Sequence, residues 1–344
     1  MRIKLKALLV SATMLAMPTA ALADGELNIF NWGNYISPDM VKKFETENNV
    51  KVTVTDYDSN DSALAKVRAG GHGFDMVVPS ANYMQIWIKE GLLLETRPDQ
   101  MPNFKNVEAK WADVPYDPGR HYSVPWQWGT TGVVVSRAAY TGDIDTSNIF
   151  LDPPPELAGK INVVPEMGDI MTLAIFNQGG KQCTDDKEVL KRVRDKLVAA
   201  KAKWLSMDYS TIDKLAKGDL MGGADWNGTS FRARLQNDKV AYGYPKEGFV
   251  VWMDNLSVLK EAKNVENAKL FQNFMMEPKN AAMLSEFARY ANGIKGSEEF
   301  MPKDMLTARE IVIPPELEEK GQFVETCPPA VTEMYTKIWT DLLK

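Results

Sequence analysis

The chain has 344 residues with a formal net charge of −6 at pH 7, and 44% of its residues are hydrophobic. This length exceeds one comfortable hydrophobic core and suggests two domains. An acidic chain without basic runs argues against nucleic-acid binding and mildly favours cationic ligands. The two cysteines and two histidines form no metal-ligand cluster, so we expect neither a metal site nor a cofactor.

The first 23 residues have the pattern of a cleavable signal peptide. Three basic residues precede a short apolar run, and Ala21 and Ala23 fit the small side chains of a cleavage site before Asp24. No cysteine lies directly after that site, which argues against a lipid anchor, and no later stretch approaches the roughly 18 apolar residues of a membrane span. We therefore expect a soluble protein exported to the periplasm.

The first part of the mature sequence alternates strands and helices. Strands are expected at residues 27–32, 51–57 and 74–80. A helix should follow each strand, with Ser37 placed to cap the first helix and Ser80 the third. This order predicts a parallel sheet covered by helices, with ligands bound beyond the carboxyl ends of its strands.

The later part predicts a second α/β unit after a Pro-rich connection. Residues 122–136 predict two strands joined by an aromatic turn from Trp126 to Trp128. Further strands are expected at 161–166, 220–226 and 239–245, and helices at 169–178, 186–203, 211–217, 264–276, 279–290 and 329–343. The mature chain should therefore form two α/β lobes.

Residues 244–257 contain the clearest candidate for binding chemistry. The segment from Phe249 to Met253 predicts a buried strand, and residues two apart on a strand share a face. Trp252 and Asp254 should then point the same way, and an indole face beside a carboxylate suits a primary ammonium. In the alternative interpretation, Trp252 caps the core and Asp254 caps a loop.

The chain should cross between the lobes twice, near residues 129–133 and again near residues 252–255. Two crossings form a hinge, and a hinge between two lobes creates a cleft that can close on a ligand.

Several segments resemble the periplasmic spermidine/putrescine-binding proteins of ABC importers. These segments are NWGNYI, FDMVVPS, WGTTGVVVS, ADWNGTSFRAR, YPKEGFVVWMDNLSV and ARYANG, and the similarity covers essentially the whole mature chain. The resemblance implies an α/β fold of the two-lobed type II periplasmic-binding-protein class with two hinge crossings. It implies residues 24–131 with about 254–292 for one lobe, and residues 132–253 with about 293–344 for the other.

The resemblance also implies the function and the binding residues. It implies a monomer that is not an enzyme, captures a small amine and delivers it to an inner-membrane ABC permease. The ligand-binding residues that it implies are Trp32, Tyr35, Ser80, Trp226, Trp252, Asp254 and Tyr290. Aromatic walls for a methylene chain and carboxylates for its ammonium ends are the chemistry that an amine needs.

A second set of candidate ligand-binding residues comes from positions where the sequence departs from the family or offers another polar group. This set contains Asn34, Asn82, Glu166, Asp169, Thr229 and Arg232. Asn34 and Thr229 stand where relatives carry acids, so the second ammonium of a diamine has a less obvious partner. Arg232 could meet a carboxylate instead. We therefore expect a short amine, either a polyamine such as putrescine or spermidine or a zwitterion such as 4-aminobutyrate.

Alternative functions rest on fewer residues. A sugar receptor of the same fold would use the aromatic residues but would not need Asp254 against an indole, and no motif of a periplasmic hydrolase surrounds His72 or His121. In the oxidising compartment that we expect, Cys183 and Cys327 could pair in a disulfide.

Overall fold

The computed structural model describes residues 25–344, so the predicted signal peptide lies outside the described residues. A nine-stranded mixed sheet runs through the molecule in the order β2-β1-β3-β8-β4-β6-β5, with β7 on β4 and β9 on β8. The strands are β1 (Glu26–Trp32), β2 (Lys51–Tyr57), β3 (Met76–Val77), β4 (Ser123–Ser136), β5 (Ile161–Val163), β6 (Gly222–Trp226), β7 (Val240–Gly243), β8 (Phe249–Val258) and β9 (Gly321–Phe323).

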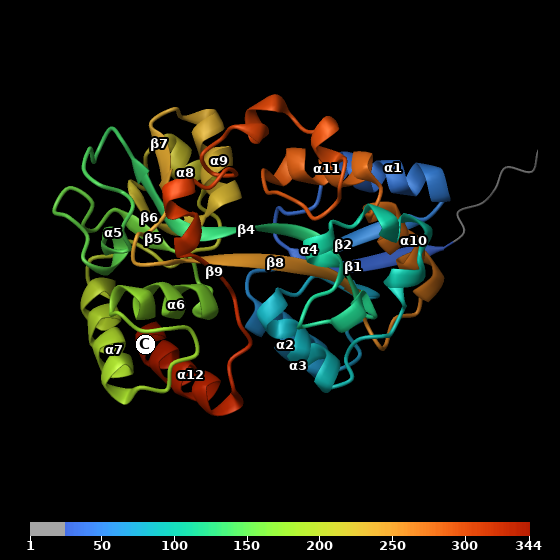
Figure 1. Cartoon of the computed structure of the whole chain (residues 1–344), viewed down its shortest axis with the longest axis horizontal. Coiled ribbons are helices and arrows are strands. Elements are labelled where there is room, and N and C mark those ends of the chain that lie inside the picture. The colour runs from blue at the N-terminus through green and yellow to red at the C-terminus, as the bar shows by residue number, and fades with distance from the viewer. Residues whose placement is uncertain (1–24) are drawn as a thin grey trace, which may run out of the picture.

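The sheet has two parallel ends and an antiparallel centre. Strands β1, β2 and β3 are parallel at one end, and β5 and β6 are parallel at the other. The long strands β4 and β8 pair antiparallel and connect the two ends across the middle of the molecule (Figure 1). The two-lobed α/β fold expected from the sequence is therefore confirmed, whereas the exact lobe boundaries stay a prediction.

The first lobe is built on β1, β2 and β3. Its helices are α1 (Pro38–Asn48), α2 (Asn60–Arg68), α3 (Ala81–Lys89), the short α4 (Ala109–Ala112), α10 (Val265–Met275) and α11 (Pro278–Ala288). In Figure 1, α1 and α11 lie above the strands and α2 and α3 below them. Helix α1 begins as expected, because the Ser37 hydroxyl accepts a hydrogen bond from the Met40 amide and the buried Met40 and Phe44 face the core.

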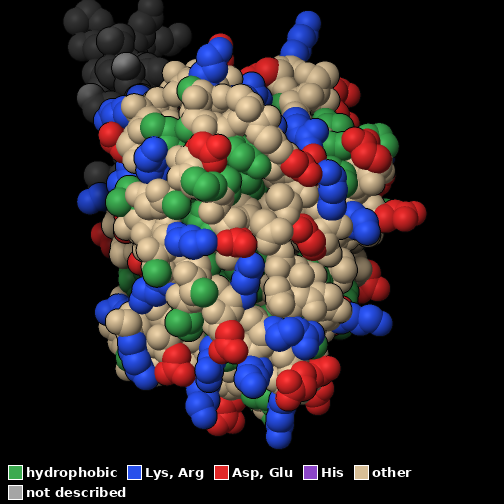
Figure 2. Space-filling view, turned by 90° about the vertical axis from the view of Figure 1, so that its left-hand side faces the viewer, with side chains coloured by type: hydrophobic (Ala, Val, Ile, Leu, Met, Phe, Trp, Pro, Cys, Tyr) green, Lys and Arg blue, Asp and Glu red, His purple; other side chains and the backbone are tan. Residues whose placement is uncertain are grey.

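The second lobe is built on β5, β6 and β7. Its helices are α5 (Asn148–Leu151), α6 (Met167–Asn177), α7 (Lys187–Lys201), α8 (Ile212–Lys217), α9 (Asn227–Gln236) and α12 (Pro329–Leu343). Short 3₁₀ helices occur at Pro98–Gln100, Pro102–Asn106, Pro118–Arg120, Ser297–Glu299, Lys303–Leu306 and Pro315–Lys320. The end face of this lobe mixes acidic and basic side chains (Figure 2). Within the described range, every helix is too short or too polar to span a membrane.

Three predicted elements differ in the structure. Residues 123–136 form the single strand β4 with a bulge between Pro125 and Trp128, and not two strands with a turn. The bulge lets both halves of β4 pair with β8 while it changes the local register. Strand β3 has only two residues, and β8 extends through Asp254 to Val258. These lengths follow from long-range pairing, because β8 pairs with both β3 and β4.

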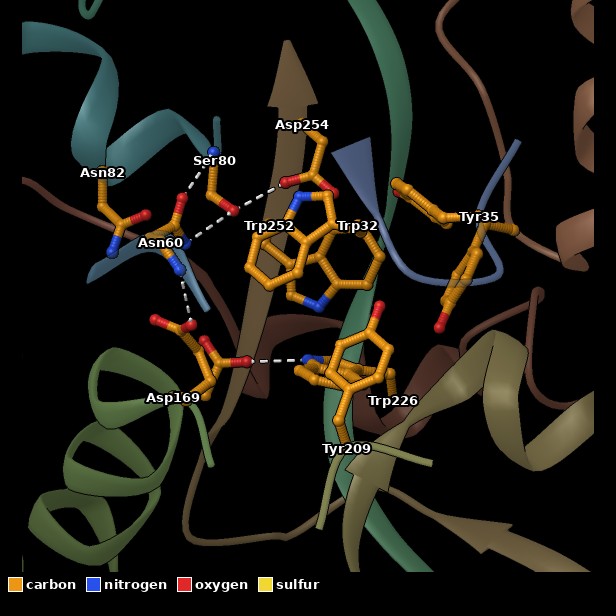
Figure 3. A pocket seen from close by; sticks show the side chains of 12 residues that line it. Trp32, Tyr35, Asn60, Ser80, Asn82, Asp169, Tyr209, Trp226, Trp252 and Asp254 are labelled. Atoms are coloured by element: carbon orange, nitrogen blue, oxygen red, sulfur yellow. Dashed lines mark hydrogen bonds between the residues drawn. The ribbon is translucent and has the colours of Figure 1, made fainter. Parts of the chain in front are cut away.

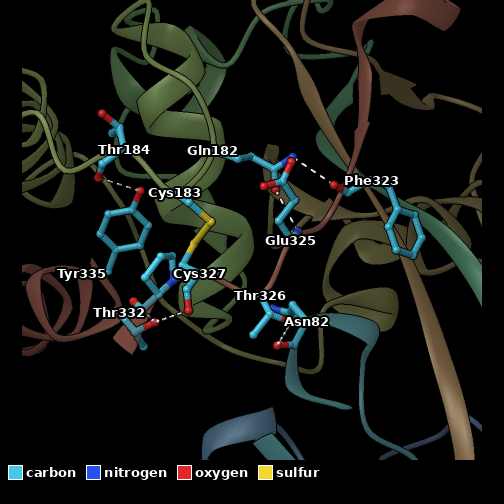
Figure 4. Close-up of a disulfide and its surroundings, with 11 residues drawn as sticks. Asn82, Gln182, Cys183, Thr184, Phe323, Glu325, Thr326, Cys327, Thr332 and Tyr335 are labelled. Atoms are coloured by element: carbon cyan, nitrogen blue, oxygen red, sulfur yellow. Dashed lines mark hydrogen bonds between the residues drawn. A yellow bond between two sulfur atoms is a disulfide. The ribbon is translucent and has the colours of Figure 1, made fainter. Parts of the chain in front are cut away.

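Residues 321–327, which we call the C-terminal strap, contact both lobes. The strap pairs with β8 through β9, and its Phe323 ring stacks on Tyr116 of the first lobe. Its far end is joined to the second lobe by a disulfide between Cys183 and Cys327 (Figure 4). The hydroxyl of Thr326 donates a hydrogen bond to the carbonyl of Asn82, at 2.9 Å.

Candidate functional site

A narrow cavity lies between the two lobes beside β4 and β8 (Figure 3). Its volume open to the centres of water molecules is ≈ 40 Å³. The residues that line it are Trp32, Tyr35, Asn60, Ser80, Asn82, Glu166, Asp169, Tyr209, Trp226, Trp252, Asp254 and Tyr290. They come from the carboxyl ends of β1 and β6, from the starts of α2, α3 and α6, from β8, and, for Tyr35, Tyr209 and Tyr290, from connections between elements.

Aromatic rings form the walls of the cavity. The indole of Trp32 donates a hydrogen bond to the Val78 carbonyl at 2.9 Å and lies edge-on to Trp226, with ring centroids 6.4 Å apart. On the other side, the Tyr290 ring contacts both Tyr35 and Trp252, at centroid distances of 5.4 and 5.2 Å. These rings give the cavity apolar faces that suit a methylene chain and can attract a cation.

The turn after β6 explains why glycine follows Trp226-Asn227. A Cβ atom at Gly228 would lie 2.5 Å from the Tyr290 ring, closer than a side chain can approach. Gly228 therefore allows α9 to begin directly beneath this ring. The Trp-Asn-Gly sequence brings Trp226 and Tyr290 into one site through this close contact.

Asp254 is the carboxylate on one side of the cavity. It is 5% exposed, and the Ser80 hydroxyl donates a hydrogen bond to its Oδ1 at 2.6 Å. Desolvation raises the pKa of Asp254 to about 7, although the Ser80 hydrogen bond acts in the opposite direction. A bound cation would restore the charged form, because the cation replaces the solvation that burial removes. The Ser80 hydroxyl therefore binds Asp254, and the Ser80 side chain does not cap α3 as expected.

Asp169 lies on the opposite side of the cavity, at the start of α6 (Figure 3), and Glu166, the residue before α6, lines the same cavity. Asp169 Oδ2 accepts hydrogen bonds from the Thr131 hydroxyl at 2.5 Å and the Trp226 indole at 3.0 Å. Burial raises the pKa of Asp169 to about 6. Burial, followed by the charge of Asp169, raises the pKa of Glu166 well above its usual range. None of the described residues that line the cavity is basic.

The structure brings most of the predicted site residues together in this cavity. All seven residues of the first set and three of the second set, Asn82, Glu166 and Asp169, line it. Asn34, Thr229 and Arg232 do not; they line a neighbouring hollow on the other side of the tyrosines. Tyr35, Tyr209 and Tyr290 border both spaces, and a role of Asn34, Thr229 and Arg232 in ligand binding stays a prediction.

Arg232 is held by the first lobe in this structure. Its guanidinium donates hydrogen bonds to the backbone oxygen and the side-chain oxygen of Asn34, at 3.0 and 3.1 Å. Thr229 shares a hydrogen bond with the Tyr290 hydroxyl. Tyr35, Tyr209 and Tyr290 separate the cavity from the neighbouring hollow, and we call them the tyrosine wall. Arg232 and Thr229 lie on the outer side of this wall.

Sequence reasoning missed two residues of the cavity, Asn60 and Tyr209. Asn60 is the first residue of α2, three residues after β2 ends, so it is not among the strand-end residues that the sequence points to. Tyr209 lies in an irregular connection between α7 and α8, and its hydroxyl donates to the Gly33 carbonyl at 3.1 Å. No periodic pattern in the sequence distinguishes this tyrosine from other surface aromatics.

A two-lobed α/β protein with an aromatic and acidic cavity between its lobes has the architecture of a ligand-binding receptor. The family model for bacterial extracellular solute-binding proteins matches residues 39–310, and the chain belongs to that family. Family membership confirms the expectation of a binding protein and not an enzyme.

Relatives and solved structures show which binding proteins this chain resembles. The chain is 29% identical to a spermidine/putrescine-binding periplasmic protein of Escherichia coli, over 89% of this chain and 86% of that protein. It is 28% identical to such a protein of Haemophilus influenzae, over 84% of this chain and 81% of the relative. A solved spermidine/putrescine ABC transporter protein of Listeria monocytogenes has a TM-score of 0.86, 28% identity, and coverage of 92% of this chain and 98% of its own.

Proposed function

We propose that this chain captures a short diamine between its lobes and delivers it to an ABC permease in the inner membrane. The observation that carries the proposal is the presence of acidic groups on opposite sides of one aromatic cavity. Asp254 lies on one side and Asp169 on the other (Figure 3), and Glu166, three residues before Asp169 in the chain, also lines the cavity. An ammonium buried without a partner costs several kcal/mol, so two acidic ends favour a ligand with two cationic ends.

The size of the cavity supports a short ligand. Only ≈ 40 Å³ of the cavity is open to the centres of water molecules. A thin, four-carbon diamine such as putrescine needs less room than spermidine or a hexose. Longer amines would require the lobes to close less completely.

A zwitterion such as 4-aminobutyrate is the second candidate. Its support is the Trp252 indole N–H, which is buried and has no hydrogen-bond partner among the described residues. A ligand carboxylate could accept that N–H. However, the same carboxylate would have to share the cavity with three acidic side chains and no basic one, and like charges at short range repel.

Other parts of the proposal follow from the relatives. Their names place them in the periplasm, which agrees with the export expected from the N-terminal pattern. We extend this location to the present chain, as a soluble monomer without a lipid anchor. We also propose that the closed form is what the permease recognises.

The first experiment is a thermal-shift panel of putrescine, cadaverine, spermidine, agmatine, 4-aminobutyrate and glucose, with the wild type and Asp254→Asn. Putrescine at about 100 times its dissociation constant should add roughly 2.7 kcal/mol of stability, which raises the midpoint by several degrees. Asp254→Asn should lose this shift and keep its fold, as judged by circular dichroism. A shift with 4-aminobutyrate or glucose and none with any diamine would contradict the proposal.

A further inference from the structure

Asn60 is a buried residue at the first position of α2, with 2% of its surface exposed. Its side chain makes two hydrogen bonds to Ser80. Asn60 Oδ1 accepts the Ser80 backbone N–H at 3.1 Å, and Asn60 Nδ2 donates to the Ser80 hydroxyl oxygen at 3.1 Å. The backbone N–H can only donate, so it fixes which way the amide faces.

This orientation decides where the Ser80 proton points. A hydroxyl has one proton to donate, and its oxygen here already accepts a hydrogen from Asn60. The proton is therefore directed at Asp254 Oδ1, 2.6 Å away. A donor that is held toward a carboxylate oxygen favours the charged form of that carboxylate, which is the form that an ammonium binds.

The backbone of Asn60 reaches the other acidic end of the cavity. Its N–H donates to Glu166 Oε2 at 3.4 Å, and Glu166 lies at the start of α6 in the second lobe. One residue of the first lobe is therefore connected to Asp254 through Ser80, and directly to Glu166, an acidic residue of the second lobe that also lines the cavity.

We propose that Asn60 is a positioning residue for ligand capture, which directs the Ser80 proton to Asp254 and holds Glu166 against the first lobe when the cleft is closed. The inference rests on the proposed amine-binding function. The other titratable groups around Asp254 are Tyr35, Tyr57, Tyr116, Tyr209, Tyr290, Glu166 and Asp169. Desolvation raises the pKa of each tyrosine, so these five stay neutral while Asp254 titrates.

The test substitutes Asn60→Asp, which keeps the shape of the side chain but replaces its donor by an acceptor. The Ser80 proton should then turn toward residue 60, away from Asp254. Calorimetric titration with putrescine should show at least a tenfold loss of affinity at pH 7. The pH at which affinity is half-maximal should rise by about one unit, so that part of the loss is recovered at pH 8 to 9.

The matched control is Ser62→Asp, which adds the same charge to the first turns of α2 at an exposed position. An equal shift of the pH profile in both variants would overturn the inference, because charge alone would then explain it. If the wild type binds no amine, the proposed function fails; if the wild type binds and the two variants behave alike, only the role of Asn60 fails.

A double-mutant cycle tests the same inference without adding charge. Asn60→Ala should weaken putrescine binding several-fold, and Ser80→Ala should weaken it by about tenfold. If Asn60 acts through Ser80, the double variant should bind about as weakly as Ser80→Ala alone. Losses that multiply would show that Asn60 acts independently of Ser80 and would overturn the proposal, even if Asn60→Asp does not fold.

Discussion

At the scale of single residues, the cavity holds carboxyl groups whose protonation opposes ligand binding. Burial raises the pKa of Asp169 to about 6 and that of Asp254 to about 7. A diamine binds to the ionised carboxylates, so any proton that these groups carry must leave on binding. The aromatic walls add cation–π attraction but do not titrate in this range.

We therefore predict that putrescine affinity increases with pH between 5 and 8, where the ligand itself stays charged. Below about pH 6, affinity should fall by about tenfold per pH unit for each carboxyl group that must ionise. Calorimetry at constant ionic strength, in two buffers with different ionisation enthalpies, would give both the affinity and the number of protons released. An affinity that is constant from pH 5 to 8 would contradict this assignment.

The same carboxyl groups affect the ligand-free protein in the opposite direction. In the unfolded chain the pKa of Asp254 returns to its ordinary value of 3.8, from about 7 in the folded protein. Between these values the folded state binds more protons than the unfolded state, so the contribution of Asp254 to stability decreases as pH rises. Ligand-free stability and ligand affinity should thus respond to pH with opposite signs.

At the scale of elements, β4 and β8 form the connection on which the site is built. Their pairing continues from Ser123 opposite Ser257 to Thr131 opposite Val250, and it passes the bulge without ending. Asp254 and Trp252 lie on β8, and Thr131, which donates to Asp169, lies on β4. The same pair of strands thus connects the lobes and holds both ends of the cavity.

The C-terminal strap is a second element whose role can be measured. The disulfide between Cys183 and Cys327 spans 144 residues of sequence. Closing a loop of this length stabilises the fold by about 5 kcal/mol in the chain-entropy estimate, and typically by 2–4 kcal/mol in practice. We predict that the double variant Cys183→Ser with Cys327→Ser unfolds at a clearly lower temperature or denaturant concentration than the wild type.

Reductant provides the control for the disulfide. It should lower the unfolding midpoint of the wild type toward that of the double variant and leave the double variant unchanged. Equal midpoints for the oxidised wild type and the double variant would mean that the contacts of Phe323 and Thr326 hold the strap without the covalent link.

At the scale of the whole molecule, hydrogen bonds between the lobes hold the cleft closed beyond the tyrosine wall. The Arg232 guanidinium binds Asn34, and the Tyr209 hydroxyl binds the Gly33 carbonyl. These contacts can form only when the lobes are together. They favour the closed form, and a ligand that binds only that form is held more tightly as the closed population grows.

We predict that Arg232→Ala weakens the binding of all ligands of this protein by a similar factor, about five- to tenfold, without changing their order. Ligand release followed by tryptophan fluorescence should be faster by a comparable factor. The matched control is Arg194→Ala, an exposed arginine of α7 that pairs with Asp195. A loss confined to 4-aminobutyrate would show instead that Arg232 binds a ligand carboxylate directly.

Much of this protein follows from local sequence patterns. Hydrophobic residues that recur about every two or every 3.6 positions predict β1, β2 and most helices. They recur at this spacing because each element buries one of its faces. The alternation of strands and helices predicts the α/β class, and the two-residue period of β8 correctly puts Trp252 and Asp254 on the same cavity. The resemblance to a family added the aromatic residues of β1 and β6.

Other features depend on contacts between residues far apart in the sequence, which no local pattern records. The continuous strand β4, the two-residue β3 and the strap between the lobes are set by strand pairing across the molecule. Asn60 enters the cavity through its hydrogen bonds to Ser80, and Tyr209 through its hydrogen bond to Gly33 of the other lobe. Arg232 lies outside because Tyr209 and Tyr290 border both spaces. The sequence by itself determined the elements and the chemistry of the site, while the tertiary structure decided which side chains meet, because that depends on the packing of both lobes.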